Sequence, residues 1–307
     1  MAGLEKGNQT LITEFLLVGF KTLPGLQITL FVVFFGIYLA TVAGNLLLIL
    51  TVWADRHLHT PMYFFLSNLS FLETGYISNI VPRLLGSLAT GDRTISFSGC
   101  FLQLFVFSFL GAAECLLLIC HPLHYTSRMS PRASFLLAFA SWALGFVTPS
   151  FTIMMAAQLP FCGPQEINHF FCDLTALLKL SCTDASLTEI TALVSAATIS
   201  LAPFLLTITS YVCVILAILQ IPSTAGRQKA FSTCSSHLIV VSTFYGALII
   251  MYVVPSGSQS LDFNKVFSLL YTVVTPLFNP IVYSLRNQEV RVALGRAIRK
   301  MWPSPKM

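Results

Sequence analysis

Twenty consecutive residues decide how the chain is arranged: FLQLFVFSFLGAAECLLLIC, at positions 101–120. Only one of them, Glu114, is charged. A helix of this length is about 30 Å long, which matches the hydrocarbon core of a bilayer. If this segment crosses the membrane, each later loop is assigned to a side. If it does not, every later loop changes sides.

Six other stretches have the same apolar character. The chain is 55% hydrophobic and only 9% charged, whereas a soluble domain carries about 25% charged residues. Lipid must therefore be the solvent for much of the chain. We read all seven stretches as helices, because an open strand would leave peptide groups without hydrogen-bond partners in lipid. The fold class is thus predicted to be an all-α membrane protein, a seven-transmembrane helix bundle, and the other six spans are residues 27–53, 62–85, 134–161, 190–221, 230–254 and 266–285.

The segments outside the bundle are short. We predict an extracellular N-terminus at residues 1–26, the seven-helix transmembrane domain at 27–285 and a cytoplasmic tail at 286–307. Between residues 288 and 301 the tail alternates apolar and basic residues, which is typical of an amphipathic helix on a membrane surface. No apolar run with a small-residue cleavage site lies in residues 1–15, so we expect no removable signal peptide.

Charge predicts the orientation. With the N-terminus outside, the cytoplasmic segments hold eleven basic residues against two acids, Asp55 and Glu289, while the outer segments hold six basic residues and eight acids. Lys and Arg favour the cytoplasmic side. The triplet at residues 8–10 agrees with this orientation, because it makes Asn8 a glycosylation acceptor on the lumenal side.

Four cysteines fall on the outer side. Cys100 opens the third span, and Cys162, Cys172 and Cys182 lie in the loop after the fourth. In an oxidising compartment four cysteines can form two bridges. Their spacing alone leaves three pairings open.

Four motifs spread over the chain resemble those of the olfactory receptors. The strings LHTPMYFFL and KAFSTCSSHL, at residues 58–66 and 229–238, are highly specific to that family. The pair GN at 44–45 also matches that family, and the string PLFNPIVY at 276–283 resembles the wider rhodopsin-like G-protein-coupled receptor pattern. The resemblance implies that Cys100 pairs with Cys172 and Cys162 with Cys182.

The chain departs from that family in one place. Family members carry a segment with Asp-Arg-Tyr between two strings that here join directly, ECLLL at 114–118 and ICHPLHY at 119–125. About ten residues are missing, worth about 15 Å of helix. The third span is therefore predicted to be shortened, ending near residue 120, and coupling to be impaired or lost. The alternative is that loop residues wind into the helix and partial function survives.

The resemblance also implies a ligand pocket in the outer half of the bundle. Four candidates on the sixth span share one helix face, with spacings of three and four residues. The same spacing is also expected of residues that only pack in the core of the helix bundle. No charged residue is among the candidates, which favours a small, neutral, largely apolar odorant. The candidates are Phe107, Ser108, Gly111, Ala112, Ser195, Ile199, Tyr245, Leu248, Ile249, Tyr252 and Thr272.

A second set of residues is implied to act in activation and coupling. A carboxyl group inside a span is costly, so Glu73 is a functional candidate by default. The resemblance places it in a polar cluster with Asn45 and Asn279, although a carboxyl that only ties helices together would look the same. The remaining members, nearer the inner face, are Tyr211, Lys229, Pro280, Tyr283 and Arg286.

Other classes of protein fit less well. A transporter would show inverted repeats or paired charges inside spans, and an enzyme would need a nucleophile–base pair or a metal cluster. The string Cys120-His121-Pro122-Leu123-His124 lacks an evident fourth ligand for zinc. We therefore predict a multi-pass plasma membrane receptor that is no enzyme and needs neither cofactor nor metal. Its expected partners are a volatile odorant, a stimulatory heterotrimeric G protein and membrane lipid, with no nucleic acid. The alternative is a folded relative that does not signal or is retained inside the cell.

Overall fold

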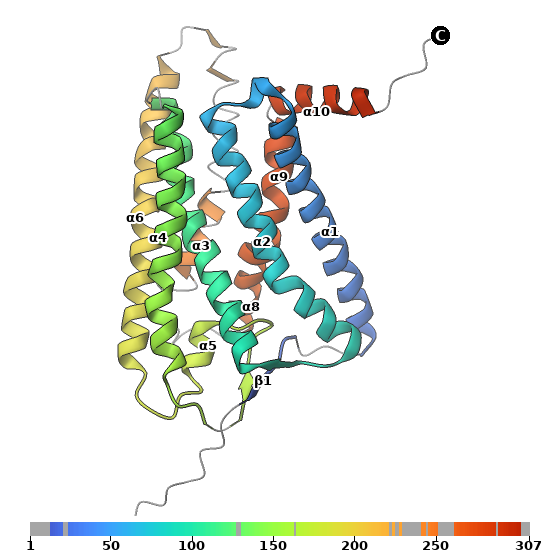
Figure 1. Cartoon of the computed structure of the whole chain (residues 1–307), viewed down its shortest axis with the longest axis vertical. Helices are drawn as coiled ribbons and strands as arrows, with labels where there is room; N and C mark the ends of the chain where they lie inside the picture. Colours follow the sequence, from blue (N-terminus) through green and yellow to red (C-terminus); the bar gives the residue numbers. More distant parts are fainter. Residues whose placement is uncertain are drawn as a thin grey trace, which may run out of the picture.

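The computed structural model of the chain describes residues 13–20, 24–126, 130–162, 164–220, 223–224, 227–228, 241–243, 245–250, 261–286 and 288–301. Long helices run roughly along one axis, and a short helix lies across one end of them (Figure 1). Among the described residues, five helices are long and apolar enough to cross a membrane.

The helices lie close to the predicted spans. The first five are α1 (Pro24–Ala54), α2 (Pro61–Thr90), α3 (Phe97–Thr126), α4 (Pro131–Ala157) and α6 (Ser186–Leu219). Within the predicted sixth span, the described residues 241–243 and 245–250 are helical. The seventh consists of α8 (Leu261–Leu269), a π-helical turn (Leu270–Val274) and α9 (Thr275–Arg286).

Local sequence signals account for several helix ends. Pro61 and Pro131 stand in the first turns of α2 and α4, where a missing N–H is harmless. The Ser130 side chain caps α4 by accepting a hydrogen bond from the backbone N–H of Ala133 at 3.2 Å. Gly91 ends α2 with a φ of 76°, a conformation that favours glycine.

The predicted end of the third span near residue 120 is wrong. α3 has 30 residues, as many as α2, because the helix continues through residues 121–126. Only residues 127–130 separate it from α4. Unwound backbone in an apolar environment would lack hydrogen-bond partners, so the missing segment shortens the loop and leaves the helix long. The loop residues therefore wind into α3, as the alternative expectation stated.

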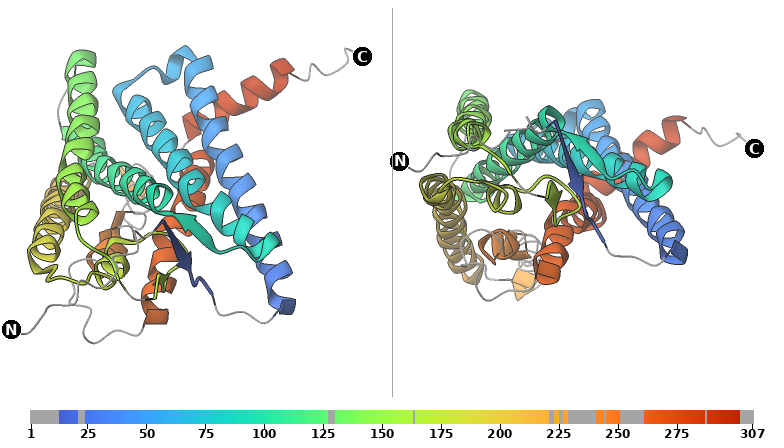
Figure 2. Two further views of the ribbon diagram at one scale, coloured as in Figure 1. Left: turned by 60° about the horizontal axis from the view of Figure 1, so that its bottom comes forward. Right: turned by 90° about the horizontal axis from the view of Figure 1, so that it is seen from below.

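A small sheet and two disulfides close one end of the bundle, which we call the outer end. β1 (Glu14–Leu17) pairs antiparallel with β2 (Thr94–Ser96) and parallel with β3 (Glu166–Ile167). The disulfides join Cys100 to Cys172 and Cys162 to Cys182. Figure 2 shows this layer lying across the helix ends.

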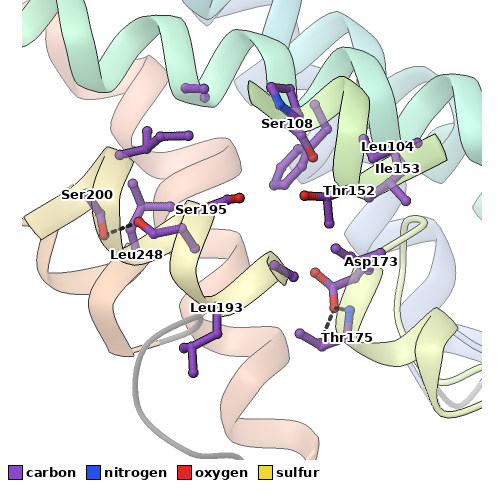
Figure 3. Close-up of a pocket in the computed structure, with 18 of the residues that line it drawn as sticks. Leu104, Ser108, Thr152, Ile153, Asp173, Thr175, Leu193, Ser195, Ser200 and Leu248 are labelled. Atoms are coloured by element: carbon purple, nitrogen blue, oxygen red, sulfur yellow. Dashed lines mark hydrogen bonds between the residues drawn. The ribbon is translucent and has the colours of Figure 1, made fainter. Parts of the chain in front are cut away.

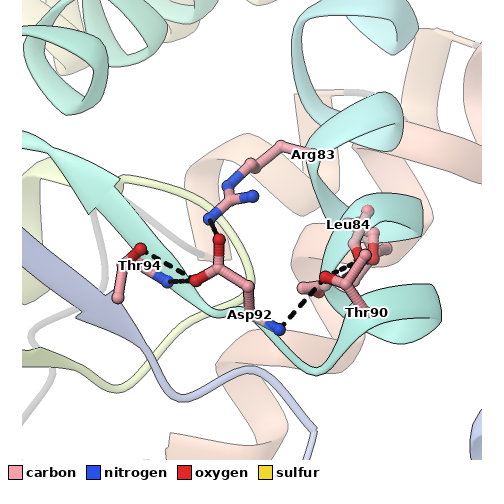
Figure 4. Close-up of polar contacts among 7 residues, drawn as sticks. Arg83, Leu84, Thr90, Asp92 and Thr94 are labelled. Atoms are coloured by element: carbon pink, nitrogen blue, oxygen red, sulfur yellow. Dashed lines mark hydrogen bonds and ion pairs between the residues drawn. The ribbon is translucent and has the colours of Figure 1, made fainter.

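An ion pair ties the end of α2 to the same layer. Arg83 Nη2 lies 3.6 Å from Asp92 Oδ2 (Figure 4). Asp92 Oδ1 accepts hydrogen bonds from the backbone N–H and the hydroxyl of Thr94, at 2.9 and 2.8 Å. These bonds to the charged form keep the pKa of the Asp92 carboxyl below its usual range.

The opposite, inner end carries α10 (Gln288–Met301), whose bounds match the predicted amphipathic helix. Arg296 Nη2 lies 2.8 Å from Asp55 Oδ2, and the Tyr63 hydroxyl donates to Glu289 Oε2 at 2.8 Å. Val290 and Ala293 are buried against the inner ends of α1 and α2. Short contacts therefore hold α10 across the bundle (Figure 1).

Burial identifies α3 as the central helix. It contacts α2, α4 and α6. On the outer helices, by contrast, large apolar side chains face outward, among them Val32 at 62%, Phe139 at 64% and Leu205 at 63% exposed. Such a surface requires lipid around it.

Candidate ligand-binding site

A cavity of about 460 Å³ lies near the outer end of the bundle. This volume is within the range of small-molecule pockets. Its walls come from α3, α4 and α6, and the short helix α5 (Leu174–Leu178) covers it (Figure 3). Buried side chains of β1 and β3 form one apolar cluster with Leu177 and Leu178 of α5, and the disulfide Cys100–Cys172 joins this loop to α3.

One face of α3 forms the longest wall. Its lining residues recur at i, i+3, i+4, i+7, i+8 and i+11, so they share a single stripe of the helix. All four pocket candidates on this helix lie there. The stripe consists of Leu104, Phe107, Ser108, Gly111, Ala112 and Cys115.

The opposite wall contains three more of the predicted residues. Ser195 and Ile199 of α6 line the cavity, and Leu248 reaches it from the sixth span. The cavity is therefore mostly apolar with a few hydroxyl groups. Such a lining suits an apolar ligand that carries a small polar group.

Three predicted residues do not line the cavity. Tyr245 is fully buried, donates its hydroxyl to the backbone carbonyl of Cys115 at 2.7 Å and packs on Phe204. The Thr272 hydroxyl donates to the carbonyl of Ser268 at 2.6 Å within its own helix. Ile249 is also absent from the lining. Tyr245 and Thr272 belong to the helix core because their polar atoms are satisfied there, and Tyr252 lies outside the described residues.

Three charged residues, Asp173, Lys179 and Glu189, also line the cavity, and the sequence did not predict them there. Asp173 is buried, and its Oδ1 accepts from the backbone N–H groups of Thr175 and Ala176 as the N-cap of α5. Lys179 and Glu189 are exposed. The Asp173 carboxylate thus organises the cover.

Sequence reasoning also missed the contribution of α4. Pro149, Thr152 and Ile153 line the cavity, and Gly145 and Ala156 continue the same face. A signal was present, because these residues recur at helical spacing and most of them are small. A small-residue face allows close packing against a neighbouring helix.

Beside the cover, a second cluster of polar groups is buried. Lys265 Nζ donates to the carbonyl of Gly19 at 2.9 Å and to Asn168 Oδ1 at 2.8 Å. His169 Nε2 lies 3.1 Å from Ser268 Oγ. Burial lowers the pKa of His169 to about 4, so its ring is neutral at pH 7.

Deeper in the bundle, the structure brings together three residues of the predicted activation set. Asn279 Nδ2 donates to Glu73 Oε1, and Asn45 Nδ2 donates to the carbonyls of Thr41 and Pro276 at 3.1 and 3.2 Å. All three residues are buried. The cluster joins α1, α2 and α9, the last of which also approaches α1 where Pro280 faces Gly44.

The other predicted inner-face residues are placed only in part. Tyr211 is buried on α6. Tyr283 and Arg286 lie on α9 by their backbone, but their side chains fall outside the described part of the chain. Lys229 and the glycosylation acceptor Asn8 also lie outside the described residues, as do the side chains of Cys120, His121 and His124.

Known proteins resemble this chain along nearly its whole length. A family model described as Olfactory receptor matches residues 34–301. The chain is 49% identical to olfactory receptor 10A5 of Homo sapiens over 306 residues, covering 96% of each protein. It is 46% identical to olfactory receptor 11A1 of Homo sapiens over 302 residues, covering 95% of each. The crystal structure of squid rhodopsin superposes with a TM-score of 0.67 at 13% identity, covering 94% of this chain and 89% of that one.

Proposed function

The chain belongs to the olfactory receptor family, and from that premise we propose that it binds a small, neutral, largely apolar odorant in the cavity between α3, α4 and α6. Like other members it is a seven-transmembrane receptor of the plasma membrane and no enzyme. The observation that carries the proposal is the cavity itself, with its apolar walls and scattered hydroxyl groups. Of the three charged residues in the lining, Lys179 and Glu189 are exposed, and Asp173 caps α5.

We further propose that odorant binding is transmitted to a stimulatory G protein. A ligand shifts a conformational equilibrium only if it binds one state more tightly than the other. The cluster of Asn45, Glu73 and Asn279 lies deeper in the bundle than the cavity and joins three helices. Rearrangement of this cluster would carry the change toward the inner face.

The proposed lipid partner is the cytoplasmic leaflet. α10 buries one apolar side against the inner ends of α1 and α2, while Val292 is 51% exposed. Its basic residues suit anionic lipid headgroups. We propose that α10 lies in the interface plane, as amphipathic basic helices do.

A substitution that fills the cavity tests the proposed binding site. The Ala112 side chain lines it, so Ala112→Leu should occupy space that the odorant needs. In cells that express the tagged chain at the surface, we expect an odorant panel to raise cAMP, and Ala112→Leu to raise the half-maximal concentration at least tenfold. The matched control is Ala143→Leu, which makes the same change on an exposed face of α4 and should respond like the wild-type chain.

Two further experiments test the coupling to the G protein. Cells that lack the stimulatory G-protein α-subunit should give no cAMP response. A version with the family's Asp-Arg-Tyr segment inserted between Leu118 and Ile119 tests coupling. A silent surface-expressed chain beside a responsive restored version would favour the non-signalling alternative. Equal responses of Ala112→Leu and the wild-type chain would refute the cavity as the binding site.

A further inference from the structure

One hydroxyl group on α4 differs from all its neighbours on that helix. Serine and threonine hydroxyls inside a helix commonly donate to a carbonyl four residues earlier. On α4 four hydroxyls do so, with the acceptor carbonyls of Ser130 for Ser134, Leu137 for Ser141, Leu144 for Thr148 and Phe146 for Ser150. Thr152 is the exception, because its buried Oγ1 has no hydrogen-bond partner among the described residues.

An unpaired hydroxyl in such a place is unfavourable. Thr152 is 4% exposed, so its hydroxyl is shielded from bulk solvent. A buried donor without a partner destabilises the fold, and a buried polar group is usually satisfied within the protein. A bound molecule that supplied the acceptor would remove this cost.

The hydroxyl faces the cavity. Thr152 is one of its lining residues, and Figure 3 shows the hydroxyl oxygens of Thr152, Ser108 and Ser195 pointing into the same space. Other side chains in the lining, including Leu104, Ile153 and Leu248, are apolar, and the Asp173 carboxyl also lines the cavity. A ligand there meets a small polar site inside apolar walls.

We infer that Thr152 determines which odorants bind, by donating a hydrogen bond to an oxygen of the ligand. The ligand class is a neutral molecule with one carbonyl, ester or ether oxygen on an apolar skeleton. Ser108 and Ser195 extend the polar site, and the apolar walls hold the skeleton. This inference rests on the proposed function, since it assigns a ligand class to the same cavity.

Matched odorants test the inference. Octanal and acetophenone carry a carbonyl, while 1-octene and ethylbenzene have similar skeletons without it. We expect the wild-type chain to respond to the carbonyl compounds at lower concentrations than to their hydrocarbon counterparts. Thr152→Val, which removes only the hydroxyl, should raise the half-maximal concentration for the carbonyl compounds by roughly 3- to 10-fold, the effect of losing one neutral hydrogen bond.

Two variants control for structure. Thr152→Ser keeps the hydroxyl and should stay within about threefold of the wild-type response, since the donor is retained. Thr148→Val makes the same change on the same helix at a hydroxyl already bonded to Leu144, and should leave the carbonyl preference intact. Surface staining of each variant reports folding.

A second measurement needs no response. In the purified chain, octanal should slow the reaction of Thr152→Cys with N-ethylmaleimide, measured above the wild-type background, and should leave that of Thr148→Cys unchanged. If Thr152→Val keeps the full carbonyl preference, or octanal does not protect Thr152→Cys, the inference is overturned while the proposed function stands. Silence of the wild-type chain toward all four compounds, together with labelling of Thr152→Cys that octanal does not change, would overturn both.

Discussion

His169 illustrates how a single buried residue links the outer cover to the bundle. It lies in the loop between α4 and α6, is 4% exposed and contacts Ser268 of α8. Its ring packs against Phe170 and Phe171 at centroid distances of 4.7 and 4.4 Å. Such surroundings favour the neutral ring over the charged one.

We expect this residue to make the receptor less stable in acid. The unfolded chain binds a proton at His169 near pH 6.5, whereas the folded chain does so only near its pKa of about 4. Its contribution to stability is therefore complete above pH 6.5 and is lost as the pH falls toward 4. The difference between these pKa values corresponds to about 3 kcal/mol.

The measurement is the melting temperature of the purified chain between pH 7 and pH 4. His169→Gln keeps a hydrogen-bonding group toward Ser268 but does not titrate. Over this pH interval the melting temperature of the variant should fall less than that of the wild-type chain. An identical decline in both proteins would show that other groups set the acid sensitivity.

At the scale of helices, the tightest contact joins α3 and α4. A Cβ placed on Gly145 would lie 2.8 Å from the backbone nitrogen and the Cβ of Ala113. Because part of this contact is backbone, a flexible side chain cannot move aside to relieve it. The two helices approach closely only because position 145 carries no side chain.

Gly145→Ala should therefore destabilise the bundle. Overpacking costs about 1–3 kcal/mol, so we expect the melting temperature to fall by several degrees. The control is Gly36→Ala on α1, where the added methyl group would meet nothing within 4 Å. A melting temperature of Gly145→Ala at or above that of Gly36→Ala would contradict the close contact.

Much of the helix arrangement could be predicted from the sequence, because lipid imposes a strict length and polarity on each span. The amphipathic helix α10 was also predictable from its alternating basic and apolar residues. The sheet of β1, β2 and β3 was not, since its strands have two to four residues and are too short for a periodic pattern. The end of α3 was predicted wrongly because the loop residues after Cys120 carry no apolar pattern, yet their backbone still gains hydrogen bonds by continuing the helix.

The residues that line the pocket could be predicted only in part. Helical periodicity identifies a buried face but does not separate core from cavity. On α3 the two coincide, so Phe107, Ser108, Gly111 and Ala112 were placed correctly at the wall. On the sixth span Tyr245 shares the periodicity but is held in the core by the carbonyl of Cys115. Thr152 could not be distinguished from Thr148 or Ser150, because only the structure shows which hydroxyls are already bonded.

On the scale of the whole molecule, α3 connects the outer cover, the cavity and the loop before α4. Its first turn carries Cys100, which is bonded to the cover over the cavity. Its middle forms the main wall of the cavity, and its last residues, up to Thr126, lead into the loop before α4. The outer cover and the inner helix α10 lie at opposite ends of the bundle (Figure 1), as the distribution of charge along the chain requires.

The most direct measurement asks whether the two ends of α3 face opposite sides of the membrane. Glu166→Cys and Arg132→Cys place thiols at exposed positions beyond the outer and inner ends of α3. A membrane-impermeant maleimide should label Glu166→Cys on intact cells and Arg132→Cys only after permeabilisation, with the wild-type chain as background. Labelling of both variants on intact cells would mean that α3 does not cross the bilayer, and the receptor topology would be wrong.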